Sequence, residues 1–265
     1  MVAITDQEFA QFQKFIFESA GITLSAAKKA LVSGRLARRL DLNNSTSYDE
    51  YFRLLSSGKA PNEVQMAIDL LTTNETYFFR EPKHFEFLRK QVAQFPGSQP
   101  LRIWSAAGST GEEAYSIAML LEDVRGGHPW EVMASDISAR VLQRARAGHY
   151  PMERARHVPR EYLRRFCLKG EGEQEGTLLV EKSLRNKVKF LQVNLNEPFP
   201  NVGTFDIVFL RNVLIYFNGE TKRKVVSRVL SVVPSGGWLL IGHSESLHGV
   251  NDSVHAVAPS IYRKP

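Results

Sequence analysis

The stretch Leu101-Arg-Ile-Trp-Ser-Ala-Ala-Gly-Ser-Thr-Gly-Glu-Glu-Ala-Tyr-Ser116 decides the fold of this chain. Its residue types predict a short buried strand over residues 101–105, a tight turn of small residues, and a helix that begins at Glu112. Gly108 and Gly111 carry no Cβ and can adopt positive φ, so we expect the turn to let a ligand approach the backbone. The helix that follows offers unpaired N–H groups beside this turn.

A second strand is predicted over residues 130–136, and it ends in Asp136. Strand, glycine turn, helix, strand and acid form the layout of a nucleoside-binding half-domain, in which the acid takes the ribose hydroxyls. An ordinary strand–helix unit that binds no ligand is the alternative interpretation.

The acids at the helix start narrow the choice of ligand. The turn lacks the third glycine of the dinucleotide fingerprint, and Glu112 and Glu113 place negative charge where a pyrophosphate would bind. Two carboxylates at this position favour a ligand without phosphates that carries cationic or hydroxyl groups. S-adenosylmethionine meets that description, because it has a sulfonium, an ammonium and a ribose. Without a ligand, the two glutamates would only complement the helix dipole.

Length and composition bound the class of protein. The 265 residues are enough for one large domain or two smaller ones, and 43% hydrophobic with 23% charged residues is typical of a soluble globular protein. No apolar run approaches the roughly 20 residues of a transmembrane helix, and the N-terminus has no basic-then-apolar signal pattern. The single cysteine, Cys167, excludes an internal disulfide. We therefore expect a cytoplasmic protein that is not embedded in a membrane.

The sequence predicts an all-helical N-terminal domain over residues 1–75. Thr5 and Glu8 have the spacing of a capping box ahead of aromatic residues that share one helical face, and Gly21 fits the end of that helix. Further helices are predicted over residues 26–40, 48–56 and 61–71.

Positive charge is concentrated on one of these predicted helices. The net charge of +6 and the pI near 9.4 favour an acidic partner, either an anionic protein surface or a nucleic acid. Residues 26–40 include five basic residues and no acidic one, and Arg35, Arg38 and Arg39 share a helical face. These charges could form a solvated helix face or a docking face for the acidic partner.

The stretch Leu71-Thr-Thr-Asn-Glu-Thr-Tyr-Phe-Phe-Arg-Glu81 is a second candidate for the functional site. It places several hydrogen-bonding side chains directly beside three aromatic residues, which is rare in a purely structural segment. A helix cap followed by core aromatics is one interpretation. The other is a polar strip that lines a cleft, with Arg80 as an oriented cation that grips a carboxylate.

The pattern of strands and helices expected over residues 76–265 predicts an α/β domain. Residues 150–190 break its alternation of strands and helices, and we expect a small antiparallel β insertion there. Arg211 and Asn212 follow a fully buried strand, at the end where α/β sheets bind ligands. The histidines are scattered without ligand spacing, so we expect no metal site.

Five motifs of the chain, taken in order, resemble those of the chemotaxis receptor methyltransferases of the CheR type. The similarity extends over nearly the whole length. The motifs are Thr72-Thr-Asn-Glu-Thr-Tyr-Phe-Phe-Arg80, Trp104-Ser-Ala-Ala-Gly-Ser-Thr-Gly-Glu-Glu113, Ala134-Ser-Asp-Ile137, Arg211-Asn-Val-Leu-Ile-Tyr-Phe217 and Gly242-His-Ser-Glu-Ser246.

The resemblance implies a Rossmann-like S-adenosylmethionine-dependent methyltransferase sheet with an N-terminal helical domain and a small antiparallel β insertion. It implies methyl transfer to glutamate side chains of chemoreceptor cytoplasmic domains for sensory adaptation, with S-adenosylhomocysteine as product. Nothing in the sequence demands a dimer, so we expect a monomer, and we expect no nucleic-acid partner. The implied catalytic residues are Arg80 and Tyr216.

By the same resemblance, Arg35, Arg38 and Arg39 match the family's receptor-docking helix. The insertion resembles the subdomain that tethers a receptor's C-terminal peptide in some members. The implied cofactor contacts are Asn74, Thr76, Arg80, Glu113, Asp136, Asn194, Leu195, Leu210, Arg211 and Asn212.

Two other classes of function are alternatives for this sequence. A nucleic-acid methyltransferase would suit the positive charge, but Arg211-Asn-Val-Leu has no proline where base-amino methyltransferases commonly carry an Asn/Asp-Pro-Pro-aromatic motif. Cys167 lies in the insertion and is not placed to attack a cytosine. A non-catalytic sensing or receptor-binding module is the other class, and the presence of Arg80 and Tyr216 argues against it.

Overall fold

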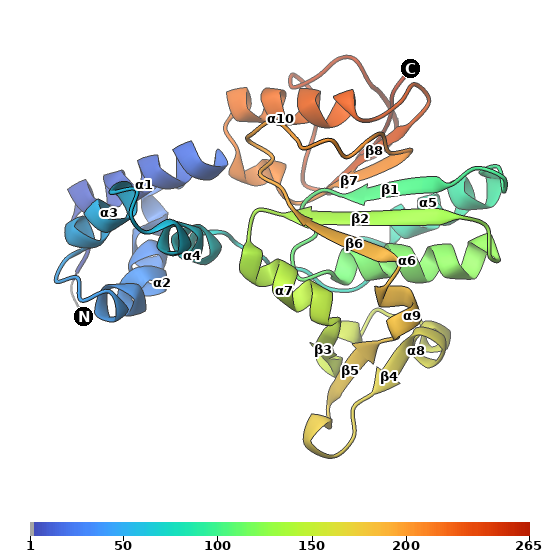
Figure 1. Ribbon diagram of the computed structural model, residues 1–265. Helices are drawn as coiled ribbons and strands as arrows, with labels where there is room; N and C mark the ends of the chain where they lie inside the picture. The colour runs from blue at the N-terminus through green and yellow to red at the C-terminus, as the bar shows by residue number, and fades with distance from the viewer. Residues whose placement is uncertain (1–2) are drawn as a thin grey trace.

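A computed structural model describes residues 3–265 of the chain (Figure 1). Within these residues, the largest sheet is mostly parallel, and the last two strand pairings in its spatial order are antiparallel. The strands in spatial order are β6 (Val188–Gln192), β2 (Trp130–Asp136), β1 (Leu101–Ser105), β7 (Ile207–Leu210), β8 (Trp238–Ile241), β10 (Ile261–Arg263) and β9 (His255–Ala258).

The register of the sheet brings three strand ends together. Ser105 at the end of β1 pairs with Ala134 of β2 on one side and with Phe209 of β7 on the other. The carboxyl ends of these parallel strands therefore meet at one edge, which is where α/β sheets bind ligands.

Helices cover both faces of the sheet because β1 and β7 are buried on both sides. Ile103 belongs to one buried cluster and its neighbour Trp104 to the other, as the alternation of side chains along a strand requires. The helices α5 (Pro82–Gln94) and α6 (Glu112–Arg125) pack on the Ile103 side, and α10 (Gly219–Ser231) packs on the Trp104 side (Figure 1). The helix α7 (Ala139–Ala147) contacts β2 and β6.

The N-terminal helices form a lobe beside the sheet. The expected capping box of Thr5 and Glu8 is confirmed, and Gly21 ends the first helix with φ of 72°. The helix expected from residue 26 begins later, because residues 26–28 form a 3₁₀ turn. The helices of the lobe are α1 (Asp6–Ala20), α2 (Lys29–Leu42), α3 (Tyr48–Ser56) and α4 (Pro61–Leu71).

The expected antiparallel insertion is confirmed and lies at the bottom of the molecule in Figure 1. Its strands are β3 (His149–Pro151), β5 (Thr177–Val180) and β4 (Cys167–Lys169), in that order, with the helices α8 (Arg160–Phe166) and α9 (Lys182–Arg185) beside them. Across residues 3–265, no helix combines the length and the apolar character needed to cross a bilayer.

The core of the lobe yields a prediction for stability. Phe12 on α1 is fully buried, and its ring lies within 6.2 Å of the rings of Tyr48, Tyr51 and Phe52. Phe12→Ala should therefore lower the free energy of unfolding by about 3–5 kcal/mol, as measured by urea denaturation. Phe17→Ala is the matched control, because Phe17 lies on the same helix and is 40% exposed. Equal losses for the two variants would contradict this packing.

Candidate functional site

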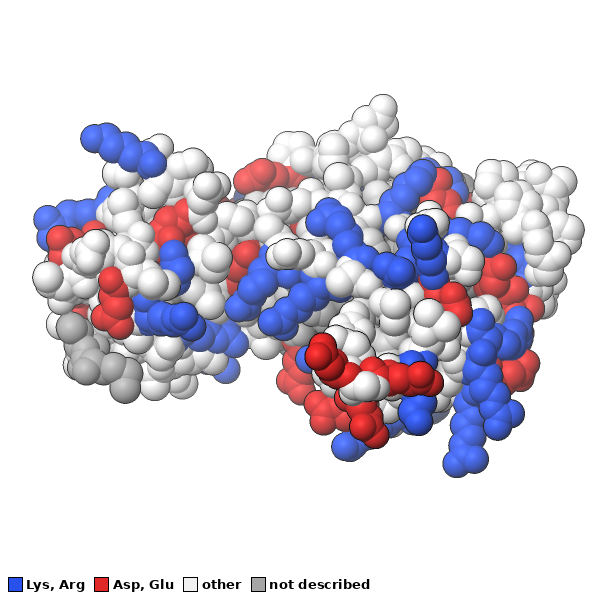
Figure 2. Space-filling model, turned by 60° about the horizontal axis from the view of Figure 1, so that its bottom comes forward, with Lys and Arg blue, Asp and Glu red and all other residues white. Residues whose placement is uncertain are grey.

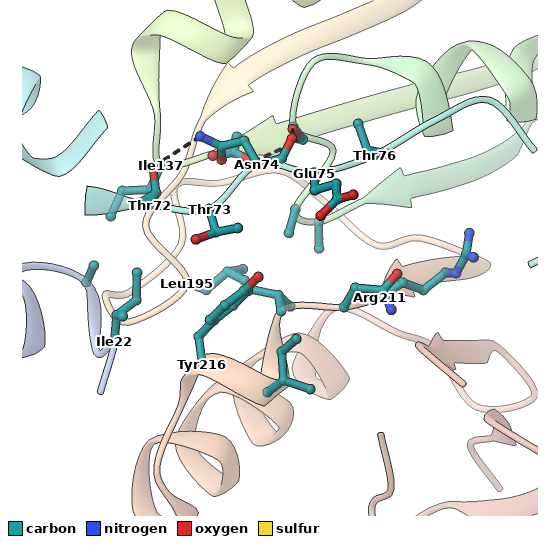
Figure 3. Close-up of a pocket in the computed structure, with 18 of the residues that line it drawn as sticks. Ile22, Thr72, Thr73, Asn74, Glu75, Thr76, Ile137, Leu195, Arg211 and Tyr216 are labelled. Carbon is teal, nitrogen blue, oxygen red and sulfur yellow. Dashed lines mark hydrogen bonds between the residues drawn. The ribbon is translucent and has the colours of Figure 1, made fainter. Parts of the chain in front are cut away.

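A cavity of about 280 Å³ lies at the carboxyl ends of β1, β2 and β7 (Figure 3). Its walls come from residues 72–76, from the turn after β1, from the end of α1 and from the loop of residues 211–217. The residues predicted from the sequence that line it are Asn74, Thr76, Arg80, Glu113, Asp136, Asn194, Leu195, Arg211, Asn212 and Tyr216.

Leu210 is the predicted contact residue that does not line this cavity. Its side chain is fully buried within β7, a strand covered on both faces. The chain reaches the cavity at the next residues, Arg211 and Asn212.

The segment of residues 72–76 is extended rather than helical, and it runs along one side of the cavity (Figure 3). Arg35 donates hydrogen bonds to the carbonyl oxygens of Leu71 (3.1 Å) and Thr72 (3.0 Å). The hydroxyl of Ser109 donates to the carbonyl oxygen of Asn74 at 3.0 Å. The polar side chains thus line a cleft, as one of the two interpretations of this stretch predicted.

The opposite wall joins the N-terminal lobe to the sheet. Figure 3 shows Ile22, Leu195 and Tyr216 facing the 72–76 segment. The backbone N–H of Thr23 donates to the carbonyl oxygen of Tyr216 at 2.8 Å, so the segment after α1 holds the loop that carries Tyr216. No local pattern in the sequence marks Ile22 as a site residue, because the residues that it faces across the cavity are distant in the chain.

The opening turn lines the cavity, and Gly111 within it also serves packing. The turn reaches the cavity through Ala106, Ala107 and Ser109, and neither glycine lines it. Gly111 has φ of 95°, and a Cβ there would lie 2.9 Å from atoms of Ala145. The approach of a ligand to the backbone of this turn stays a prediction. Gly111 is required because α6 starts close against α7.

Asp136 lies at the end of β2 and lines the cavity. Its carboxylate accepts hydrogen bonds from the backbone N–H groups of Ser109 (3.0 Å) and Ser138 (2.9 Å), which fix its orientation. Burial raises the pKa of Asp136 to about 6, although these hydrogen bonds favour ionisation. The group is mostly ionised at neutral pH and can accept further hydrogen bonds from a ligand.

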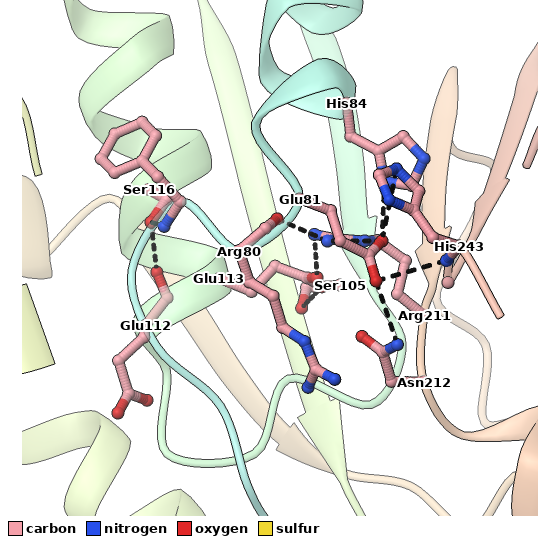
Figure 4. A network of polar contacts seen from close by, with 12 residues as sticks. Arg80, Glu81, His84, Ser105, Glu112, Glu113, Ser116, Arg211, Asn212 and His243 are labelled. Atoms are coloured by element: carbon pink, nitrogen blue, oxygen red, sulfur yellow. Dashed lines mark hydrogen bonds and ion pairs between the residues drawn. The ribbon is translucent and has the colours of Figure 1, made fainter. Parts of the chain in front are cut away.

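The two acids at the start of α6 have different surroundings. Glu112 is fully buried, turns away from the cavity and pairs with Arg154 at 2.6 Å (Figure 4). Glu113 lines the cavity and accepts a hydrogen bond from the hydroxyl of Ser105 at 2.7 Å. The expectation that both carboxylates face the ligand is therefore wrong, because adjacent helical residues point in different directions.

Arg211 forms ion pairs with two acids, Glu81 and Glu113 (Figure 4). Its side chain is 1% exposed and donates to Glu113 at 2.9 Å and to Glu81 at 3.0 Å. Burial raises the pKa of Glu113 despite the opposing charge of Arg211. Burial also acts to raise the pKa of Glu81, but the charge and hydrogen bonds of Arg211 outweigh it, and that pKa is lowered. One guanidinium thus compensates two carboxylates.

Glu81 also lies beside two histidines, a grouping that the sequence spacing does not indicate. Its carboxylate and the rings of His84 and His243 offer atoms within 4.8 Å of one another, a geometry that could hold a metal ion. However, Arg211 occupies the same carboxylate, and its charge opposes a bound cation. Burial, followed by the charge of Arg211, lowers the pKa of His84 to about 3, so this ring is neutral. We assign the group to the polar network around Arg211.

Arg80 lines the cavity beside this network. Its guanidinium donates to the carbonyl oxygen of Glu75 at 3.0 Å and lies 5.9 Å from the centre of the Tyr77 ring. No carboxylate of residues 3–265 forms an ion pair with it. Arg80 can therefore receive a carboxylate from outside the chain.

The arginines of α2 do not form one free docking face. Arg35 donates hydrogen bonds to the backbone carbonyls of residues 71 and 72. Arg39 forms an ion pair with Glu63, and the Glu63 carboxylate also accepts a hydrogen bond from the Tyr51 hydroxyl at 2.6 Å. Arg38 is the exposed one of the three. Figure 2 shows that Lys and Arg side chains are frequent where the lobe meets the rest of the molecule. Internal partners thus hold Arg35 and Arg39, and the docking role expected for Arg35, Arg38 and Arg39 stays a prediction.

Comparison with known proteins links this geometry to a family. Residues 7–72 match the family described as "CheR methyltransferase, all-alpha domain", and residues 74–262 match "CheR methyltransferase, SAM binding domain". The chain is 40% identical to the chemotaxis protein methyltransferase of Escherichia coli, across 92% of this chain and 86% of the relative. It is also 40% identical to chemotaxis protein methyltransferase 2 of Pseudomonas aeruginosa, across 97% of this chain and 93% of the relative.

The network around Arg211 yields a prediction for stability and its pH dependence. Arg211→Met leaves Glu81 and Glu113 without a counterion, so the free energy of unfolding at pH 7 should fall by about 3–5 kcal/mol. In the variant, burial raises the folded-state pKa values of both carboxyls above their unfolded values. The penalty is therefore present at neutral pH and is relieved as the pH falls and the groups take up protons. Denaturant unfolding at pH 7 and pH 5 measures the difference.

The control is Arg53→Met. Arg53 pairs with Asp49 on the surface and its side chain is 71% exposed, so the expected loss is about 0–1 kcal/mol at either pH. A loss for Arg211→Met that is equally small, or that grows toward pH 5, would argue against the network.

Proposed function

Because this chain belongs to the CheR methyltransferase family, we propose that it transfers the methyl group of S-adenosylmethionine to glutamate side chains of chemoreceptor cytoplasmic domains. The products are glutamyl methyl esters and S-adenosylhomocysteine, and the reaction serves sensory adaptation in the cytoplasm. The observation that carries the proposal is Arg80, a cavity-lining arginine for which residues 3–265 supply no carboxylate partner. A substrate glutamate supplies that carboxylate.

The cavity fits the cofactor named by the family. Asp136, oriented by two backbone N–H groups, would accept the ribose hydroxyls. Asn74 and Thr76 would contact the cofactor from one wall, and Leu195 from the other. Asn194, Arg211 and Asn212 complete the proposed contacts.

Glu113 would act differently from the sequence expectation. Arg211 and Ser105 already hold its carboxylate, so it contributes as one part of a fixed network. Three carboxylates (Glu75, Glu113 and Asp136) and two guanidiniums (Arg80 and Arg211) line the cavity, which leaves its floor negative. A negative floor favours a cofactor with an ammonium and a sulfonium over one with phosphates.

The chemistry needs positioning more than proton transfer. A glutamate carboxylate is already an anion at neutral pH, so no general base has to activate it. One carboxylate oxygen forms a bond to the methyl carbon as the carbon–sulfur bond breaks. The electron pair of the carbon–sulfur bond goes to the sulfur. We assign to Arg80 the orientation of the incoming carboxylate, and to Tyr216 a hydrogen bond near the reacting groups.

The receptor would approach through charge. Arg38 is exposed on α2, three residues after Arg35, which donates to the backbone of Leu71 and Thr72, and the chain carries a net charge of +6. The insertion would supply a second contact, because β4 lies at the edge of its sheet, where a receptor's C-terminal peptide could add as a strand. One protomer contains every residue of the proposed site, so we propose a monomer as the active form.

One experiment separates this function from its rivals. The protein is incubated with methyl-labelled S-adenosylmethionine and either a chemoreceptor cytoplasmic domain or nucleic acid, and the product is treated with mild alkali. We expect label on the receptor that alkali releases as methanol, since esters hydrolyse. Alkali-stable label on nucleic acid would indicate a base methyltransferase. No label on either would indicate a binding module.

Asp136 yields a prediction for the pH dependence of cofactor binding. Hydrogen bonds from the ribose hydroxyls favour the ionised carboxyl, so binding should lower its pKa from about 6. Affinity for S-adenosylhomocysteine should then weaken as the pH falls from 7 to 5, by up to about tenfold per unit below pH 6. Calorimetric titration measures it. Asp136→Asn should bind more weakly at pH 7 and lose this pH dependence. A variant that keeps the wild-type profile would remove Asp136 from the site.

Arg38 yields a prediction for receptor docking. Arg38→Glu should raise the KM for the receptor domain about tenfold and leave the affinity for S-adenosylhomocysteine unchanged, because the charge lies outside the cavity. Arg53→Glu on α3 is the control for a charge reversal at an exposed arginine. If both variants raise KM equally, the effect is one of overall charge and Arg38 has no special role.

A further inference from the structure

The loop of residues 211–217 joins β7 to α10 and carries Asn212 and Tyr216 into the cavity wall. Asn212 has φ of 58°, in the left-handed region that non-glycine residues adopt at a cost on the order of 1 kcal/mol. Such a conformation persists only where the surroundings impose it. The source of that constraint lies outside the loop, in the motif Gly242-His-Ser-Glu-Ser246, to which the proposed function assigns no role.

Glu245 of this motif is bound to the loop through both carboxylate oxygens. Oε2 accepts from the backbone N–H of Asn212 at 2.9 Å and from that of Gly242 at 2.6 Å. Oε1 accepts from the backbone N–H of Ile215, next to Tyr216, at 3.2 Å. Hydrogen bonds to an ionised acceptor are among the stronger ones in proteins.

A local turn would explain only part of this pattern. The bond to Gly242 spans three residues, as in many turns that an acid stabilises. The bonds to Asn212 and Ile215 reach 33 and 30 residues back along the chain, to a loop that the turn does not contain.

Two further features fit the two segments together. A Cβ on Gly242 would lie 2.9 Å from the backbone nitrogen of Asn212, so only glycine allows this approach. Glu81 accepts from the side-chain amide of Asn212 and from the backbone N–H of His243, both at 3.2 Å. The loop is thus fastened to residues 242–245 on one side and, through Glu81, to the Arg211 network on the other.

We propose that Glu245 is a positioning residue, which holds the 211–217 loop in the conformation that presents Asn212 and Tyr216 to the cavity. The effect on catalysis rests on the proposed function, in which Tyr216 contacts the reacting groups. The effect on the loop does not, because it is a property of the fold alone.

Amide hydrogen exchange tests the effect on the loop without any substrate. In Glu245→Ala, the amides of Asn212, Ile215 and Gly242 should exchange at least about tenfold faster, since each loses its acceptor. Amides in β1 should keep their rates. Glu245→Gln keeps one carbonyl acceptor and should fall between the wild type and Glu245→Ala. Unchanged exchange at all three amides would overturn the inference, and so would acceleration spread evenly over the sheet.

Kinetics test the effect on catalysis. Glu245→Ala should lower kcat at least about tenfold, because a displacement near 1 Å is enough to misalign reacting groups. In a Tyr216→Phe background, Glu245→Ala should lower kcat by less than about threefold, because the two residues act as one unit. Full additivity in this double-mutant cycle would overturn the inference.

The controls separate this inference from the proposed function. Glu220→Ala removes a surface carboxylate that pairs with Lys224, and it should change neither kcat nor exchange in the loop. A Tyr216→Phe variant with wild-type kcat would overturn the role of Tyr216 and with it the catalytic part of the inference. The exchange experiment would still decide whether Glu245 holds the loop.

Discussion

Arg211 places one guanidinium between the carboxylates of Glu81 and Glu113, and its own side chain is 1% exposed. Removing one partner of a buried ion pair commonly costs about 3–5 kcal/mol, so the three groups constrain one another strongly. Glu81 is the N-cap residue directly before α5, Glu113 lies in the first turn of α6, and Arg211 follows β7. The ion pairs therefore join three segments at the carboxyl edge of the sheet, where the cavity opens.

This arrangement determines which charges remain available to a ligand. Glu113 is held by Arg211 and Ser105, whereas Arg80, on the cavity wall, contacts a backbone carbonyl and an aromatic ring. Asp136 sits at a separate point of the wall, fixed by backbone N–H groups. The cavity thus separates an acid suited to ribose hydroxyls from a cation suited to a substrate carboxylate. The N-terminal lobe completes it, through Ile22 and the hydrogen bond from Thr23 to Tyr216.

Much of this could be predicted because the signals are local. Residues close in sequence encode the capping box of Thr5 and Glu8 and the β4–β5 hairpin of the insertion, and the structure confirms both. The resemblance placed most of the cavity residues because its motifs fall at strand ends that meet in space. Leu210 is an exception, since its side chain is buried in the core while the next residue, Arg211, lines the cavity.

The remaining differences arise from long-range contacts. Arg39 is held by Glu63 on another helix, and Gly111 is required by Ala145 on α7, and neither pairing is visible in a helical period. The sequence alone indicates no role for Glu245 within its motif, because its hydrogen-bond partners in the loop lie 30 and 33 residues away. Local patterns predict which segments form helices and strands, but the partner of a buried polar group depends on how those segments are assembled.

The most direct measurement is a crystal structure of the protein with S-adenosylhomocysteine bound. We expect the two ribose hydroxyls to lie within about 3 Å of the Asp136 carboxylate, with Arg80 beside the sulfur and open to a substrate carboxylate. A ligand bound elsewhere on the chain, with Asp136 making no contact to it, would contradict the assignment of this cavity.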